Sequence, residues 1–225
     1  MTPDMANPNH YNQSREETAM TVSDKFMVNS DAERMAAARY ATENFAWQAK
    51  LDKRDTLRLD LLVEETLGMV KTMLDDFYGQ MWFVADGKAC EIHFEATANM
   101  NADRKEALLS VSSTGKNASA KGFMAKLGEV ISGALHGMGK TIDAYGQETI
   151  KYGIVHAPGT MGSADMMPVW TLQTYRSDLN QARSTDDSVE EAFDELEKSI
   201  VARLADDVIV GVKGDRIDLV IKKQF

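Results

Sequence analysis

One long helical pattern, from Leu57 to Phe77, constrains the fold of this chain more than any other segment. Its apolar side chains recur at steps of three and four, the spacing that gathers side chains on one face of an α-helix. The stripe consists of Leu59, Leu62, Val63, Thr66, Met69, Val70, Met73 and Phe77. A stripe of this length must face a core, so the pattern predicts a long helix packed against another layer.

Strand and helix signals precede this segment. Phe26 to Asn29 reads as a short strand, and Ser30-Asp31-Ala32-Glu33 then matches the Ser-x-x-Glu capping box that opens a helix. We therefore expect a first helix from Ser30 to about Lys50. Leu51 to Arg54 then forms a short polar link to the second helix.

After the second helix the pattern changes to a period of two. Gln80 to Ala85 is a short apolar run, and Asp86-Gly87 is a hairpin turn signal. Apolar and polar residues then alternate over residues 90–96. The apolar positions are Cys90, Ile92, Phe94 and Ala96, and the polar ones are Glu91, His93 and Glu95. Two antiparallel strands are expected here.

The C-terminal third shows a similar sequence of signals. Trp170 to Ala182 is expected to form a short helix, and Ser188-Val189-Glu190-Glu191 is a second capping box. The helix that it opens presents one apolar face, made of Phe193, Leu196, Ile200 and Leu204. Gly214-Asp215 then joins two strands, of which the second alternates from Ile217 to Ile221.

Together these signals predict an α/β (α+β) fold, a two-layer sandwich in which helices cover one face of a mostly antiparallel sheet. Residues 1–22 are polar and are expected to form a disordered tail. Residues 23–225 are expected to form a single domain, with an irregular insertion around residues 101–187.

Composition narrows the classes of function. The formal net charge of -10 opposes binding to nucleic acid or to an anionic membrane surface, because both depend on clustered Lys and Arg. No apolar run is long enough to span a bilayer. The single cysteine, Cys90, has no partner for an internal disulfide and is expected to be a buried structural thiol in a reducing, cytoplasmic compartment.

The order of strand, two helices with Glu64-Glu65 in the second, and a hairpin resembles the histidine-kinase-like ATPase fold. Within that fold it is closest to the bacterial anti-sigma-factor serine kinases. The resemblance covers Lys25 to about Met100 and returns at the C-terminal strands, Val208 to Val212 and Ile217 to Ile221. It implies an ATP-binding regulatory protein that uses ATP and magnesium as cofactors.

The resemblance also assigns roles to individual residues. In that family the helix glutamate is a general base or positions a nucleophile, which implies this role for Glu65 and a contact with the nucleotide for Glu64 beside it. The family's magnesium-binding Asn falls at Met69, which has no oxygen with which to bind a metal ion. No residue is therefore assigned as a metal ligand.

The family's Asp-x-Gly motif, which binds adenine, falls at Glu95-Ala96-Thr97. Thr97 adds a side chain where the family has glycine, and glycine lets the base approach the backbone. The family's glycine-containing lid corresponds to Ser112 to Gly122, which implies nucleotide contacts at Gly115 and Gly122.

Two functional classes follow from this resemblance. The first is an ATP-dependent protein serine kinase or ATPase, with non-standard metal ligands if it is active. The second is a non-catalytic descendant that acts through protein contacts, its pocket filled by Met69 and its neighbours. In both classes the expected partner is a regulatory protein, a sigma factor or an anti-anti-sigma-like protein, and a homodimer remains open.

A separate motif predicts a different nucleotide site. Ala134 to Thr141 fits a relaxed phosphate-loop pattern, with Ala in place of the first Gly. That chemistry needs a strand before the loop and a helix after it, and neither flank fits well. A solvated glycine-rich helix end is the simpler explanation. Likewise, Glu91, His93 and Glu95 could hold a metal ion, but a half-solvated strand face explains them more simply.

Overall fold

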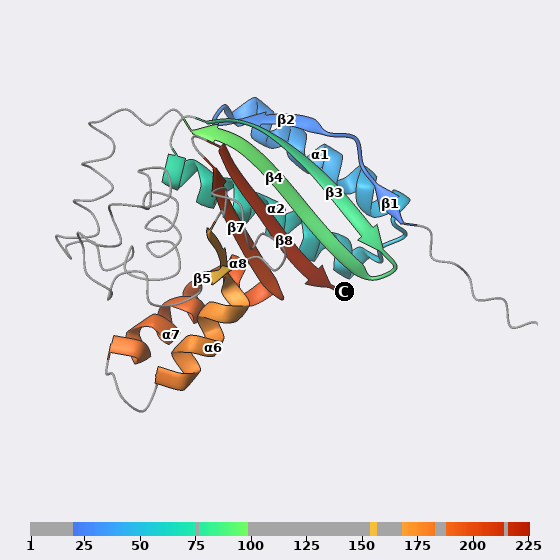
Figure 1. Ribbon diagram of the computed structural model, residues 1–225. Coiled ribbons are helices and arrows are strands. Elements are labelled where there is room, and N and C mark those ends of the chain that lie inside the picture. The colour runs from blue at the N-terminus through green and yellow to red at the C-terminus, as the bar shows by residue number, and fades with distance from the viewer. Residues whose placement is uncertain (1–19, 75–76, 99–153, 157–167, 183–187, 214–215) are drawn as a thin grey trace, which may run out of the picture.

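The computed structural model describes residues 20–74, 77–98, 154–156, 168–182, 188–213 and 216–225. These residues form an eight-stranded antiparallel sheet with helices packed on one face, as predicted. Helices α1 (Ala32–Gln48) and α2 (Lys53–Leu74) lie behind the sheet in Figure 1. The predicted α+β two-layer sandwich is confirmed.

The first two strands act as one bulged edge strand. Both β1 (Thr21–Val22) and β2 (Phe26–Asn29) pair with β3 (Phe77–Asp86), and the residues between them interrupt the ladder. At this bulge the Ser23 hydroxyl accepts a hydrogen bond from the Phe83 N–H at 2.9 Å, and the Ser23 N–H donates to the Phe83 carbonyl at 3.0 Å. Strand β1 therefore contains Thr21 and Val22, the last two residues of the segment that was expected to be a disordered tail.

The first helix begins one residue later than the capping box predicts. Asp31, not Ser30, is the N-cap residue of α1, and its side chain makes no capping hydrogen bond. Its carboxylate instead accepts a hydrogen bond from the Asn29 side chain at 3.0 Å. At the other end, Lys50 adopts φ 54° and the Leu51 N–H donates to the Ala46 carbonyl, which turns the chain towards α2.

A side-chain cap opens the second helix. The Asp52 carboxylate accepts the N–H of Asp55 at 2.9 Å, and this hydrogen bond is the main reason why the pKa of Asp52 is lowered. Asp55 itself is buried and contacts Lys88 at 3.3 Å and Arg58 at 3.4 Å. Because Lys88 lies at the tip of the next hairpin, this pair ties α2 to the sheet.

The predicted apolar stripe of α2 faces the sheet, with one correction. The buried apolar residues of this helix are Leu59, Leu62, Val63, Leu67, Met69, Val70, Met73 and Leu74. Phe77, which the helical pattern included, begins strand β3 instead. Its ring is buried and packs edge-on against Phe94 at 5.6 Å between centroids. The side chain joins the same core from the sheet rather than from the helix.

The predicted hairpin is present. Strand β3 ends at Asp86, Gly87 adopts φ 58° in the turn, and β4 (Ala89–Ala98) returns antiparallel to β3. The C-terminal strand β8 (Arg216–Gln224) then pairs with β4, so the end of the chain lies in the middle of the sheet. The path through the sheet is β1-β3-β4-β8-β7-β6-β5, with β2 also beside β3.

The remaining elements extend the sheet and its helix layer. They are β5 (Ile154–His156), β6 (Pro168–Thr171), α6 (Leu172–Ala182), α7 (Ser188–Lys198), α8 (Ile200–Leu204) and β7 (Asp207–Lys213). Helix α8 packs against α2. The residues that connect β7 to β8 lie outside the described ranges, but the two strands pair as predicted.

Two predictions about this region need correction. Trp170, expected in a helix, is a buried residue of strand β6, because its segment completes the sheet beside β7. The helix expected from Ser188 to Leu204 divides at Ser199, whose hydroxyl accepts from the Ala202 N–H at 3.2 Å and so starts a new helix. Strands β5 and β6 and helix α6 also give regular structure to part of the expected irregular insertion.

Two glycine substitutions test this packing, because one should lower the free energy of unfolding and the other should raise it. A Cβ at Gly79 would lie 2.6 Å from the Glu95 carbonyl oxygen, so Gly79→Ala should destabilise the fold by about 1–3 kcal/mol. A Cβ at Gly68 in α2 meets nothing within 4 Å, so Gly68→Ala should stabilise it by about 0.5–1 kcal/mol. Urea denaturation measures both; a stable Gly79→Ala protein would contradict the β3–β4 register.

Candidate functional site

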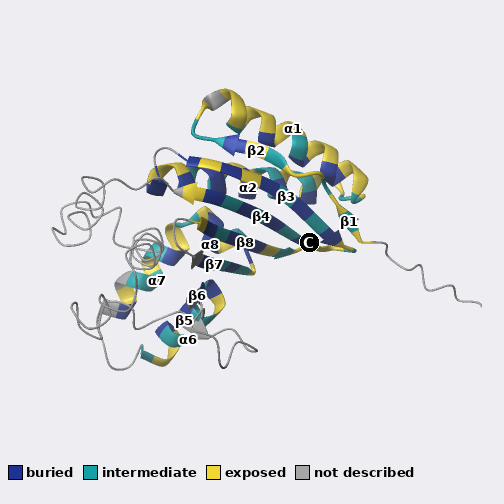
Figure 2. Ribbon diagram, turned by 45° about the horizontal axis from the view of Figure 1, so that its top comes forward, coloured by how far each residue is buried: buried dark blue, intermediate teal, exposed yellow. Residues whose placement is uncertain are grey.

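The two faces of the sheet differ in character. Side chains that point towards the helices are buried and apolar, such as Met81, Phe83, Ile92 and Leu219. The alternate residues point to the opposite face, called the outer face here, which no described helix covers (Figure 1). Figure 2 shows the same alternation of buried and more exposed positions along the strands.

A three-residue stack lies on the outer face. The Trp82 ring stacks on the His93 ring of the neighbouring strand, with centroids 4.9 Å apart and planes at 10°. From the bulge between β1 and β2, on the other side of β3, the Lys25 ammonium lies 3.8 Å from the centre of the Trp82 ring, a cation–π contact. Lys25 reaches this place because the bulge after β1 redirects the edge strand. Trp82 is therefore contacted from both neighbouring strands.

Ion pairs continue from this stack across the next strands. His93 lies 2.9 Å from Glu91, and Glu91 also contacts Lys222 of β8 at 3.4 Å. A second group joins Glu95 to Lys25 at 3.7 Å and to Arg216 at 3.0 Å. We call these six residues, with Asp218, the charged ladder: Lys25, Glu91, His93, Glu95, Arg216, Asp218 and Lys222. Each pair is partly exposed and worth less than about 1 kcal/mol, so the ladder positions side chains more than it stabilises the fold.

An apolar stripe runs beside the charged ladder, along β3 and the bulged edge strand. Tyr78 is 72% exposed, Val22 54% and Met27 49%, and Trp82 and Val84 are half-buried between them. The pairing of Val22 with Val84 and of Met27 with Gln80 places these side chains on one face. We call Val22, Met27, Tyr78, Trp82 and Val84 the outer stripe.

The residues assigned to a nucleotide site do not come together. Glu64 is exposed, Glu65 is half-buried, and Met69 is only 4% exposed within the core, all on the helix side of the sheet. Glu95 lies on the outer face, since Phe94 and Ala96 on either side of it are buried towards the helices. Thr97 shares the face of Glu95 and is exposed. The sheet separates the two groups.

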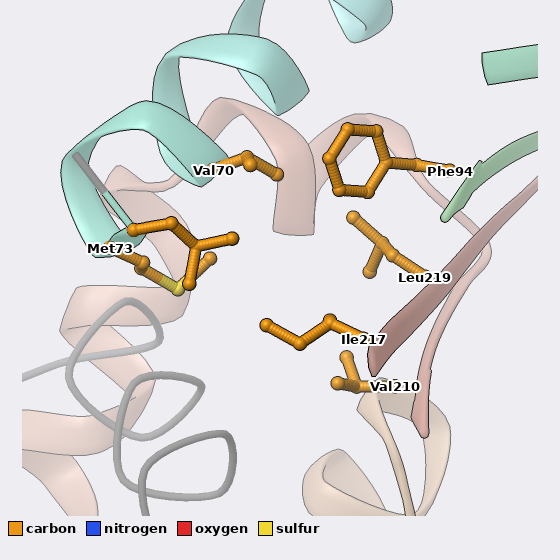
Figure 3. A pocket seen from close by; sticks show the side chains of 7 residues that line it. Val70, Met73, Phe94, Val210, Ile217 and Leu219 are labelled. Atoms are coloured by element: carbon orange, nitrogen blue, oxygen red, sulfur yellow. The ribbon is translucent and has the colours of Figure 1, made fainter. Parts of the chain in front are cut away.

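A small hollow lies between α2 and the sheet, near Met69. Its lining is entirely apolar, with Val70 and Met73 of α2 facing Phe94, Leu219, Ile217 and Val210 of the strands (Figure 3). Its free space of about 10 Å³ is that of a single water molecule. The hollow offers neither the volume nor the polar groups that a nucleotide requires.

Some of the predicted site residues lie outside the described part of the chain. Gly115, Gly122 and the phosphate-loop pattern Ala134 to Thr141 lie outside the described residues. Among the described residues, no group of three or more His, Cys, Asp or Glu is arranged to hold a metal ion. His93 is instead held by Trp82 and Glu91, and Cys90 is buried on the inner face.

Only one strand of this site was predictable from its sequence pattern. The alternation of Glu91, His93 and Glu95 indicated a polar strand face, but Lys25, Trp82, Arg216 and Lys222 were not connected with it. The signal that could have joined them is the complementary charge pattern of the last strand. Strands β4 and β8 are far apart in the chain, so the pairing of their residues is known only from the complete sheet.

No family model matches this chain, and no curated protein is similar to it. None of the helices in the described ranges is long and apolar enough to cross a membrane. The fold and the outer face therefore define the protein as an α+β sandwich with one open, mixed apolar and charged sheet face.

The buried thiol gives a pH-dependent test of the core. Burial, and to a smaller extent Glu91, raises the pKa of Cys90 from 9.0 to about 12. Between pH 9 and 12 the unfolded thiol is ionised while the folded one keeps its proton, so stability should fall as pH rises, by up to about 1.4 kcal/mol per pH unit. In urea denaturation, the Cys90→Ala protein should therefore lose less stability between pH 9 and 12 than the original protein. An equal loss in both proteins would contradict the burial of the thiol.

Proposed function

We propose that this chain is a regulatory protein that acts by binding another protein, on a histidine-kinase-like ATPase scaffold whose nucleotide site is inactive. The observation that carries this proposal is the burial of Met69 in the core, one helical turn after Glu65. In an active site of this type, that position must present a magnesium ligand to an open cleft. A buried thioether cannot serve in that role.

The placement of the carboxylates supports the same conclusion. Glu65 and Glu95 would have to contact one ATP molecule, with the reacting phosphate near one and the adenine near the other. They lie on opposite faces of the sheet, and the hollow beside α2 is apolar and small. Micromolar binding of Mg-ATP requires about 8 kcal/mol, which the described residues, with the buried Met69 in place of a metal ligand, do not supply.

The outer face supports binding to a protein. From strand spacing and rise, the open surface of β3, β4, β8 and β7 measures roughly 30 by 20 Å, comparable with one side of a standard protein interface. The outer stripe provides exposed apolar area for the centre of such a contact, and the charged ladder borders it. We infer a partner segment with an apolar side that lies along the stripe and polar groups that meet the ladder.

The resemblance favours a particular class of partner. The anti-sigma-factor kinases bind sigma factors and anti-anti-sigma proteins, and we propose a partner of that class for this chain. Nucleic acid is a poorer fit, since the faces of Trp82 on which a base would stack are contacted by His93 and Lys25. The net charge of -10 opposes it further.

Substitution of Met69 separates an inactive site from an active one. Met69→Asn removes a buried thioether and buries an amide without partners, so the free energy of unfolding should fall by about 2–4 kcal/mol, with no gain in Mg-ATP binding. Lys71→Asn, exposed on the same helix, controls for the helix propensity of asparagine. Urea denaturation and calorimetric titration measure both effects. A stable Met69→Asn protein that binds Mg-ATP would return Glu65 to a catalytic role.

The partner contact is tested through the outer stripe. Tyr78→Ser combined with Met27→Ser removes exposed apolar area without touching the core, so the protein should fold normally and bind its partner at least tenfold more weakly. Ile200→Ser, at an exposed apolar residue of α8 outside the outer stripe, is the control. Purified sigma factors and anti-anti-sigma proteins of the source organism serve as the candidate partners. Binding that survives in the stripe variant would place the contact elsewhere.

A further inference from the structure

The helix layer exposes four large apolar side chains on its solvent side. Trp47 is 82% exposed, Tyr40 69%, Leu57 58% and Leu61 39%. On α1 the buried residues Ala38, Thr42, Phe45 and Ala46 lie on the side of the helix opposite Tyr40 and Trp47, which are two turns apart along one line. Figure 2 shows the exposed side of α1 turned away from the sheet. We call Tyr40, Trp47, Leu57 and Leu61 the helix-layer patch.

The register of the two helices makes this patch continuous. The Arg39 guanidinium lies 3.2 Å from the Asp60 carboxylate, so residue 39 of α1 is level with residue 60 of α2. The helices are antiparallel, and each step along α1 is matched by a step back along α2. Leu61, Tyr40 and Leu57 therefore follow one another over about 6 Å of helix axis, and Trp47 lies about 8 Å further on. Exposed apolar surface of this extent marks a site of association.

Charges divide along the same axis. At the end where the two helices are connected, the exposed cations Lys50, Lys53 and Arg54 outnumber the single acid Asp52. At the opposite end, the acids Asp31, Glu33, Glu64 and Glu65 outnumber the cations Arg34 and Lys71. The helix layer is therefore basic at one end and acidic at the other, and between them lie the apolar patch and the ion pairs of Arg39 with Glu43 and Asp60. When two copies face each other across a two-fold axis, the basic end of each surface therefore lies opposite the acidic end of the other.

We propose that two copies of this chain associate through their α1–α2 layers, about a two-fold axis close to Tyr40. In this arrangement Lys53 faces Glu64 of the second copy and Lys50 faces its Glu33, and each contact occurs twice. Trp47 lies against Ala36 of the second copy, whose small side chain leaves room for the indole ring. The two outer faces point away from each other, so the dimer presents two partner-binding surfaces at once.

Truncation of the central aromatic side chain tests the proposal. The full chain should sediment as a dimer that dissociates on dilution, and Trp47→Ser should raise the dimer dissociation constant by roughly thirtyfold. Tyr78→Ser, at an equally exposed aromatic residue of the outer face, should leave it unchanged. A full chain that sediments as a monomer at every concentration, or a dimer weakened equally by both substitutions, would overturn the proposal.

Charge reversal tests the two-fold arrangement itself. Lys53→Glu and Glu64→Lys should each weaken the dimer, because each places like charges opposite one another twice. The double variant restores opposite charges, so its dissociation constant should return close to that of the original chain. Lys198→Glu, on an exposed position of α7, controls for the change in net charge. A double variant weaker than both single variants would exclude this orientation of the two copies.

Discussion

The packing of one helix on one face of the sheet is the interaction on which the rest of this structure depends. Helix α2 buries eight apolar side chains in the core, each worth about 1.5–3 kcal/mol when fully buried. The same packing decides what the protein can do. Because Met69 belongs to this contact, the side of the helix that resembles a nucleotide site is closed by the core that holds the fold together.

The central position of β8 gives the sheet its second property. Placing the C-terminal strand beside β4 brings Arg216 to Glu95 and Lys222 to Glu91, and so builds the charged ladder from the two ends of the described chain. The inner face becomes fully apolar and the outer face mixed. The molecule thus has two unlike open surfaces on opposite sides, the outer stripe on the sheet and the helix-layer patch on α1 and α2.

Sequence patterns predicted the helices and strands correctly where a local feature, such as apolar spacing or a glycine at a turn, decides the structure. The α2 stripe, the Asp86-Gly87 hairpin and the alternation of the last strand were each correct, because apolar spacing and glycine at a turn act over few residues. The predictions were wrong where a segment fits both a helix and a strand and its contacts in the fold decide between them. Phe77 fits both a helix and a strand, and Trp170 is drawn into the sheet by its pairing with Val210. Asp31 displaced Ser30 as cap residue by a single position.

The sequence by itself determined the class of fold and the identity of the core, since burial follows from apolar periodicity within each element. The motifs around Glu65, Met69 and Glu95 also identified them as candidate residues of a nucleotide site. Only the tertiary structure decided that these residues lie on opposite faces of one sheet, and that Lys25 meets Trp82 beside His93. Strand order and register join residues more than one hundred positions apart, and no local pattern encodes that pairing.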